Sequence, residues 1–162
     1  CGRCCDEPGG IVYLSPKDAE RIAQSNDMSV EDWLERDCRQ TLDGRYVLKS
    51  RPVDDVCIYL DENKQCSIYS VRPQQCAAFP WWGENLATER AWKKVKEECP
   101  GLTADDAILI DGETIRIHVF ADRESTKCAQ MTLHSLPSVC SSSWRARRVL
   151  LLRTFMGRRE AC

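Results

Sequence analysis

The sequence lacks the features that mark several common classes of protein. Its longest aliphatic run is only four residues, 149–152, whereas a helix that crosses a membrane needs roughly 20 apolar residues. No glycine-rich loop follows a predicted strand, so the usual cradle for a phosphate or for S-adenosylmethionine is missing. Only two histidines occur, His118 and His134, both late in the chain. These absences exclude a membrane span and leave few nitrogen ligands for a metal.

Positive charge is scarce over most of the chain. Residues 125–162 hold seven Lys and Arg and one acidic residue, which leaves 16 basic and 24 acidic residues before them. Because nucleic-acid binding requires basic side chains that neutralise phosphates, the acidic body is not expected to bind nucleic acid.

Cysteine, in contrast, is abundant, with 11 in 162 residues. Secreted disulfide scaffolds reach this density when they are too small to build a core, but this chain has enough Leu, Ile, Val and Trp to build one. An odd count also argues against complete pairing. We therefore expect an intracellular, cytoplasmic protein with reduced thiols. The first residue is Cys1 rather than methionine, so we expect that the natural start has been removed and that any leader is not observable.

Local patterns predict an α+β domain of short helices and hairpins. Ser-Pro and Ser-Val caps followed by acidic residues predict helices near 16–24 and 30–39. Further helices are expected at 70–78 and at 88–99, where Pro100-Gly101 ends the pattern. A strand at 45–50 is expected to pair with 57–60, which a polar turn joins to 66–69, and a hairpin is expected over 108–119 with Ile115, Ile117 and Val119 facing inward.

Seven cysteines have spacings that suit metal ligands. A C-x2-C turn directs two thiolates at one ion at about 2.3 Å. Adjacent Cys4 and Cys5 are expected to diverge, which suits two neighbouring ions or one ligand and one spare thiol. Closing the gap between Cys5 and Cys57 costs roughly 3.5 kcal/mol of chain entropy, whereas thiolate zinc sites are worth about 10–16 kcal/mol. The predicted ligands are Cys1, Cys4, Cys5, Cys57, Cys66, Cys76 and Cys99.

The same cysteines carry a resemblance to a known family. The relevant segments read CGRCC, CIYLDENKQCSIYSVRPQQCAAFPWW and EECPG, and they lie within residues 1–101. They resemble the CxxCxxCC zinc- or iron-chelating domain family, the YkgJ-like cysteine-cluster proteins, some of which are named flagellin lysine-N-methylases. The resemblance implies eight cysteine ligands, of which seven match here and the eighth belongs two residues before Cys1.

The sequence therefore predicts two regions: a cysteine-cluster metal-binding domain at 1–122 and a basic tail of low order at 123–162. A segment of the tail, 144–153, could instead form a basic amphipathic helix for an anionic membrane or an acidic partner. Cys38 is expected to be a packed thiol, Cys128, Cys140 and Cys162 to be non-ligands, and His118 to be a solvated residue.

Three functions stay open. The first is metal binding, with zinc or iron as the cofactor and a [4Fe–4S] cluster as one form that iron could take, since an all-sulfur ligand set suits either metal. The second is an enzyme resembling the lysine methyltransferases, with a protein substrate; no catalytic residue is identified for it. The third is a thiol redox protein that uses the vicinal pair Cys4 and Cys5.

Overall fold

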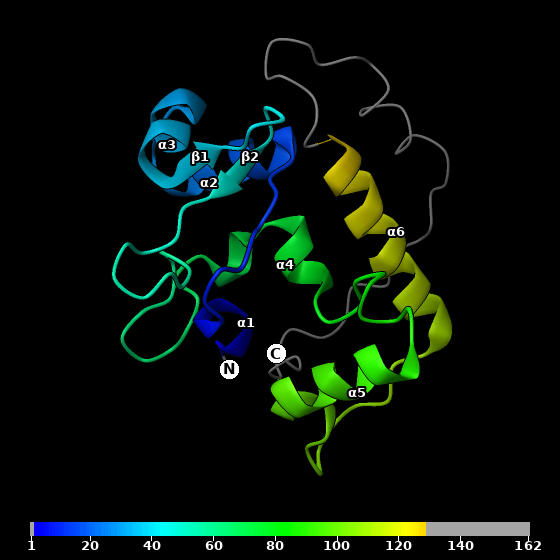
Figure 1. Ribbon diagram of the computed structural model, residues 1–162. Coiled ribbons are helices and arrows are strands. Elements are labelled where there is room, and N and C mark those ends of the chain that lie inside the picture. Colours follow the sequence, from blue (N-terminus) through cyan, green and yellow to red (C-terminus); the bar gives the residue numbers. More distant parts are fainter. Residues whose placement is uncertain (1, 129–162) are drawn as a thin grey trace.

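The computed structural model describes residues 2–128 as an α+β arrangement of short helices and one two-stranded sheet (Figure 1). The predicted α+β class is confirmed. None of the helices in the described part is both long and apolar enough to cross a bilayer. The elements are α1 (Arg3–Asp6), α2 (Pro16–Ser25), α3 (Val30–Asp37), β1 (Cys38–Gln40), β2 (Tyr46–Leu48), η1 (Tyr69–Val71), α4 (Gln74–Ala78), α5 (Glu89–Glu98), η2 (Pro100–Leu102) and α6 (Gly112–Cys128).

Side-chain caps start the helices that the sequence predicts best. The hydroxyl of Ser15 accepts from the backbone N–H of Asp18 at 3.2 Å, and the Asp18 carboxylate accepts in return from the Ser15 N–H, which completes a capping box on α2. Ser29 and Thr88 cap α3 and α5 in the same way, each accepting the N–H three residues on. The helices predicted near 16–24, 30–39 and 88–99 are therefore confirmed to within two residues.

The core lies between α2, α3, the hairpin and two turns that follow it. Trp33 and Ile22 are fully buried there, and Tyr59 and Ile68 reach the same cluster from the turns at 57–60 and 66–69. Each large side chain removed from water contributes about 1.5–3 kcal/mol. The two cysteine-bearing turns are thus attached to the core by apolar side chains.

The sheet pairs differently from the sequence prediction. β2 runs antiparallel to β1, with Cys38 opposite Leu48 and Gln40 opposite Tyr46, whereas residues 57–60 form isolated bridges, Cys57 with Ser50 and Leu60 with Cys66. The nearer partner is preferred because a tight turn closes the hairpin. In that turn the N–H of Thr41 donates to the carbonyl of Arg45 at 2.8 Å.

The largest correction concerns residues 108–119, where the predicted hairpin is wrong. These residues lead into α6, since Oδ1 of Asp111 accepts the backbone N–H groups of Glu113 and Thr114, both at 2.9 Å. Asp111-Gly112 is therefore a helix start rather than a turn between strands. Ile117, expected to face inward, is 62% exposed on α6. The domain boundary proposed after residue 122 falls inside α6, and the part of the tail after residue 128 lies outside the described residues.

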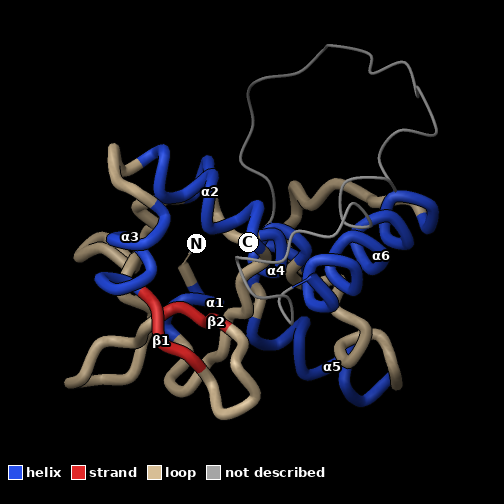
Figure 2. Tube along the Cα trace, turned by 90° about the horizontal axis from the view of Figure 1, so that it is seen from above, coloured by secondary structure: helices blue, strands red, loops and turns tan. Residues whose placement is uncertain are grey.

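α4 lies at the centre of the molecule. It has α2, α3 and the hairpin on one side and α5 and α6 on the other in both views (Figures 1 and 2). α4 packs on α6. The side chains of Trp81 and Trp92 stack at 5.5 Å between ring centroids, which joins the segment after α4 to α5. The predicted single helix at 70–78 is divided into η1 and α4, since Pro73 lacks the N–H that a continuous helix requires.

Candidate metal centre

The short helix α1 carries two adjacent cysteines whose sulfurs lie close together. The Sγ atoms of Cys4 and Cys5 are 4.0 Å apart. Two sulfur ligands at about 2.3 Å from one tetrahedral ion are separated by about 3.8 Å. The expectation that these two side chains diverge is therefore wrong, and their spacing suits ligands of one ion.

Cys57 and Cys66 each begin a four-residue turn. The N–H of Leu60 donates to the carbonyl of Cys57 at 3.1 Å, and the N–H of Tyr69 donates to the carbonyl of Cys66 at 3.2 Å. The turns are joined directly, since the N–H of Ser67 donates to the carbonyl of Tyr59 at 2.9 Å. This arrangement fixes both cysteines through local backbone hydrogen bonds.

Helix α1 is fastened against these turns by its backbone. The N–H of Cys57 donates to the carbonyl of Cys5 at 3.1 Å, and Lys64 pairs with Asp6 at 2.6 Å. Gly2 has a φ of 69°, and a Cβ at this position would lie 1.9 Å from the carbonyl oxygen of Lys64. Only glycine allows this approach, which brings the opening cysteines next to a segment more than 50 residues away.

Cys5 is the central thiol of this group. Hydrogen bonding with Cys4, and then with Cys57 and Cys66, raises the pKa of Cys5 above its ordinary value. The same contacts with Cys5 lower the pKa of Cys4 and of Cys66 to about 7 and also lower the pKa of Cys57. Four sulfurs in mutual contact, whose hydrogen bonds lower the pKa of three of the thiols, form a donor set in which a cation can replace the thiol protons.

Backbone N–H groups assist the two turn cysteines. After hydrogen bonding with Cys5, the N–H of Tyr59 further lowers the pKa of Cys57, and the N–H of Ile68 does the same for Cys66, in both cases against the effect of burial. Each donor lies two residues after its cysteine. Such N–H···S contacts orient thiolate ligands and stabilise their charge.

Cys76 lies on α4 beside this group. Burial raises its pKa well above the ordinary value, and the charges of Cys4, Cys57 and Cys66 raise it further. A metal ion would reverse both effects, because it compensates the buried negative charge. The structure therefore brings five of the seven predicted ligands together: Cys4, Cys5, Cys57, Cys66 and Cys76.

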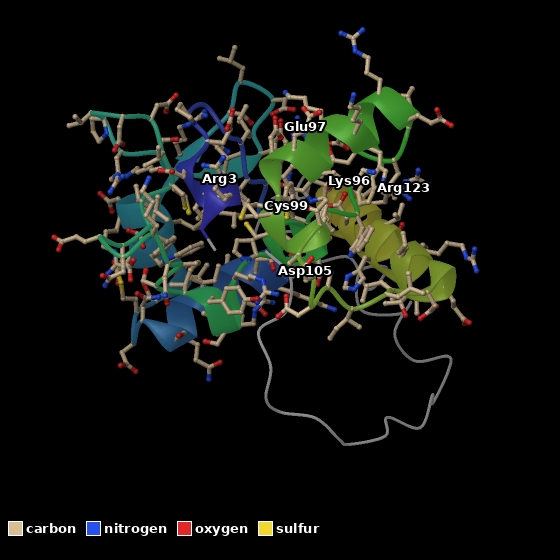
Figure 3. All side chains as sticks on the ribbon, turned by 90° about the horizontal axis from the view of Figure 1, so that it is seen from below. Arg3, Lys96, Glu97, Cys99, Asp105 and Arg123 are labelled. Carbon is tan, nitrogen blue, oxygen red and sulfur yellow. The ribbon has the colours of Figure 1, made fainter. Side chains whose placement is uncertain are left out.

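Cys99 and Cys1 differ from these five. Cys99 follows α5, is 1% exposed and is disulfide-bonded. In the view of Figure 3 it lies between Arg3 on α1 and Arg123 on α6. A sulfur in a disulfide is not a thiolate, so Cys99 can bind a metal only after reduction. Cys1 lies outside the described residues.

Within residues 2–128, no three His, Cys, Asp or Glu side chains already have their donor atoms arranged around one common point. The five thiols are therefore neighbours in the described part of the chain rather than a finished coordination sphere. The donor set itself is all sulfur, which fits zinc or iron.

The residues predicted to be non-ligands can be placed in part. Cys38 is a buried thiol of the core, as predicted, and burial raises its pKa to about 12. His118 is half-buried on α6 rather than on a strand. Cys128 ends α6, and Cys140 and Cys162 lie outside the described residues.

Sequence reasoning missed the polar side chains that hold the segment around Cys76. Asp18 was identified only as part of a helix cap, yet its carboxylate also accepts the N–H of Gln74, the first residue of α4, at 3.0 Å. Gln75 accepts the N–H of Tyr13 at 2.7 Å and thereby ties α4 to the chain that leads into α2. Both contacts span more than 50 residues, and no local pattern indicates them.

Comparison with models of protein families identifies the family of this chain. Residues 1–100, more than half of the chain, match the profile titled "CxxCxxCC: Putative zinc- or iron-chelating domain". No solved structure matches the chain. The matched region contains all seven of the predicted ligands and ends directly after Cys99.

Proposed function

This chain belongs to the CxxCxxCC family of zinc- or iron-chelating domains, and from that membership we propose that its cysteine sulfurs hold one or more zinc or iron ions as thiolates. The observation that carries the ligand assignment is the position of Cys5, which contacts the sulfurs of Cys4, Cys57 and Cys66 at once. These thiols come from α1 and from two turns in the middle of the sequence. Metal binding explains why so many thiols from distant segments gather at one place.

Energetics support the same proposal. The polypeptide around the site consists of turns and of helices as short as the four residues of α1, which are marginal alone. A thiolate zinc site contributes about 10–16 kcal/mol, more than the roughly 3.5 kcal/mol needed to close the loop between Cys5 and Cys57. We therefore propose that the bound metal also stabilises the fold.

The proposed ligand set is Cys1, Cys4, Cys5, Cys57, Cys66, Cys76 and Cys99. An all-sulfur set can bind zinc in tetrahedral sites with four cysteine ligands each, or it can bind iron as an iron–sulfur cluster. A [4Fe–4S] cluster is the form that would add redox chemistry. Thiolate ligands require a reducing compartment, which agrees with the proposed cytoplasmic location.

The test is metal analysis of the full chain, purified anaerobically under reducing conditions, with two matched variants. Cys57→Ser removes a thiol of the cluster, whereas Cys38→Ser removes a buried thiol of the core. We expect at least one equivalent of zinc or iron in the parent, loss of most of it in Cys57→Ser and unchanged content per folded molecule in Cys38→Ser. Less than half an equivalent of any transition metal in the folded parent would refute the proposal.

A second candidate is a thiol redox function, which the disulfide at Cys99 favours. Counting free thiols distinguishes it from metal binding. If thiols are masked by metal, a chelator releases them without a reductant; if they are masked by disulfides, only a reductant does. The methyltransferase alternative predicts binding of S-adenosylmethionine in calorimetry, and a null result would remove it.

A further inference from the structure

The turn that carries Cys57 is held at its third residue, Tyr59. The side chain of Tyr59 is only 9% exposed and belongs to the core that also contains Trp33. Its hydroxyl accepts from Nε1 of Trp33 at 2.8 Å and donates to Oδ2 of Asp37. Both partners lie on α3, so the phenol group is fixed from two directions.

The backbone of the same residue joins the two cysteine-bearing turns. Tyr59 lies inside the turn that the N–H of Leu60 closes on the carbonyl of Cys57 at 3.1 Å, and the carbonyl of Tyr59 accepts the N–H of Ser67 at 2.9 Å and the hydroxyl of Ser67 at 3.2 Å. Ser67 directly follows Cys66. One residue therefore connects α3 with both of the cysteine-bearing turns.

Asp37, the acceptor of the Tyr59 hydroxyl, is itself fixed. Nε and an Nη of Arg36 donate to its two carboxylate oxygens at 2.8 and 2.7 Å, and the N–H of Lys49 donates to its carbonyl at 2.8 Å. The hydrogen-bonded chain from Arg36 through Asp37 to Tyr59 is continuous. The Tyr59 ring is therefore buried and held at its hydroxyl, which restricts the movement of the turn to which it is attached.

The second turn has a simpler version of this arrangement. Ile68, two residues after Cys66 in the second turn, is 7% exposed in the same core. Ile68 is anchored by packing alone, whereas Tyr59 is anchored by packing and by two hydrogen bonds.

We propose that Tyr59 is a positioning residue for the metal centre: its hydroxyl, held by Trp33 and Asp37, fixes the turn that presents the Cys57 thiolate. This inference rests on the proposed function. Tyr59 does not touch the metal in this account, and it acts only through Cys57. Loss of such outer-shell partners typically weakens metal binding by 10- to 100-fold.

The test uses Tyr59→Phe in the full chain, which removes one oxygen and keeps the buried ring. We expect zinc affinity, measured by competition with a chromophoric chelator under anaerobic reducing conditions, to fall about tenfold. The matched control is Ile22→Val, which removes a methylene from a fully buried position of the same core and leaves the hydrogen bonds of the Tyr59 hydroxyl in place. Its zinc affinity should stay within twofold of the parent at a comparable loss of thermal stability.

A second readout needs no metal. In the apo chain, the alkylation rate of Cys57 relative to that of Cys4, resolved by peptide mass spectrometry, should change at least threefold in Tyr59→Phe. The ratio should be unchanged in Ile22→Val. A variant that keeps both turns but loses packing, Ile68→Val, should show a smaller loss of zinc affinity, about two- to threefold, and remains informative if Tyr59→Phe does not fold.

These measurements distinguish failure of the proposed function from failure of the positioning role. If the parent binds neither zinc nor ferrous iron, the proposed function fails, and the alkylation ratio still reports on Tyr59. If the parent binds zinc and Tyr59→Phe binds it within twofold, or if Ile22→Val weakens zinc binding as much as Tyr59→Phe does, the positioning role is overturned.

Discussion

Replacing Asp18 by Asn should destabilise the fold far more than the same change at an equivalent exposed helix position. Asp18 is 1% exposed, and its carboxylate receives five donors: the N–H and hydroxyl of Ser15, the guanidinium of Arg21, the N–H of Gln74 and the hydroxyl of Ser125. These donors come from α2, α4 and α6. One carboxylate therefore joins three helices.

The size of the stability loss in Asp18→Asn follows from the donors that each carboxylate oxygen accepts. Oδ1 faces Arg21 and the N–H of Gln74, and Oδ2 faces the N–H and hydroxyl of Ser15. In either orientation the amide NH2 of Asn meets a backbone N–H and leaves it unpaired, which costs about 1–3 kcal/mol. Weakened bonds on the remaining oxygen add to this loss. The salt bridge with Arg21 adds little, because the Arg21 side chain is 40% exposed.

We expect a total loss of about 2–4 kcal/mol in the free energy of unfolding. In urea denaturation of the full chain this corresponds to a midpoint lowered by about 1–2 M. The control is Asp32→Asn, since Asp32 occupies the same third position of the capped helix α3 but is exposed, and its carboxylate accepts from the hydroxyl of Ser29 at 2.7 Å. That variant should lose about 0.5 kcal/mol or less. Equal losses in the two variants would refute the role of Asp18 as a junction.

Two further predictions concern pH and the approach of α1. Burial opposes ionisation of Asp37, but hydrogen bonds led by the one from Arg36 outweigh burial and lower the pKa of the Asp37 carboxyl. The ionised Asp37 therefore contributes fully to stability above about pH 4, and this contribution is lost as the pH falls through the lowered pKa. We expect Asp37→Asn to make the free energy of unfolding depend less on pH in the acid range. Gly2→Ala should reduce metal content and stability much more than Gly44→Ala, although both glycines have a positive φ. The reason is that a Cβ on Gly2 would meet the Lys64 carbonyl, whereas a Cβ on Gly44 would have its nearest neighbour at 3.9 Å. Similar effects of the two substitutions would contradict this account.

Helix starts were the most predictable part of the fold, because the groups that decide them are close in sequence. The hydroxyls of Ser15 and Ser29 bind N–H groups three residues on, so a short window of sequence contains the whole interaction. The apolar faces were predicted for the same reason: Trp33 and Leu34 on α3, and Val95 on α5, are buried.

The error at residues 108–119 shows where local patterns become ambiguous. Asp-Gly between two β-branched runs indicates a hairpin, but the same aspartate is also a good helix cap. Contacts with α4 decide in favour of the helix, and Ser125 of α6 reaches Asp18 of α2 at 3.3 Å across 107 positions of sequence. Such distant partners override a turn signal, and the sequence alone does not identify them.

The candidate metal site could likewise be predicted only in part from the sequence. Spacing predicted which cysteines are ligand candidates, and the apolar face of the predicted helix at 30–39 indicated that Cys38 is a packed thiol. The structure places five of the candidates together. What spacing did not predict is the means of assembly. The carbonyl of Cys5 receives the N–H of Cys57, and Gly2 approaches Lys64 more closely than any other residue could.

The core holds the two cysteine-bearing turns more firmly than it holds α1, and this difference sets the order in which the site forms. The turns at Cys57 and Cys66 depend on hydrogen bonds within four residues and on core side chains that pack without metal, namely Tyr59 and Ile68. The α1 segment has a helix of only four residues with no buried side chain, so it depends on contacts with those turns. Metal binding therefore adds most to the segment that the core holds least, and chelation should release α1 before it disturbs the turns. Hydrogen exchange would show this as a selective loss of protection at the N–H groups of Cys5 and Asp6, which donate to the carbonyl of Gly2, and simultaneous loss at Leu60 would contradict it.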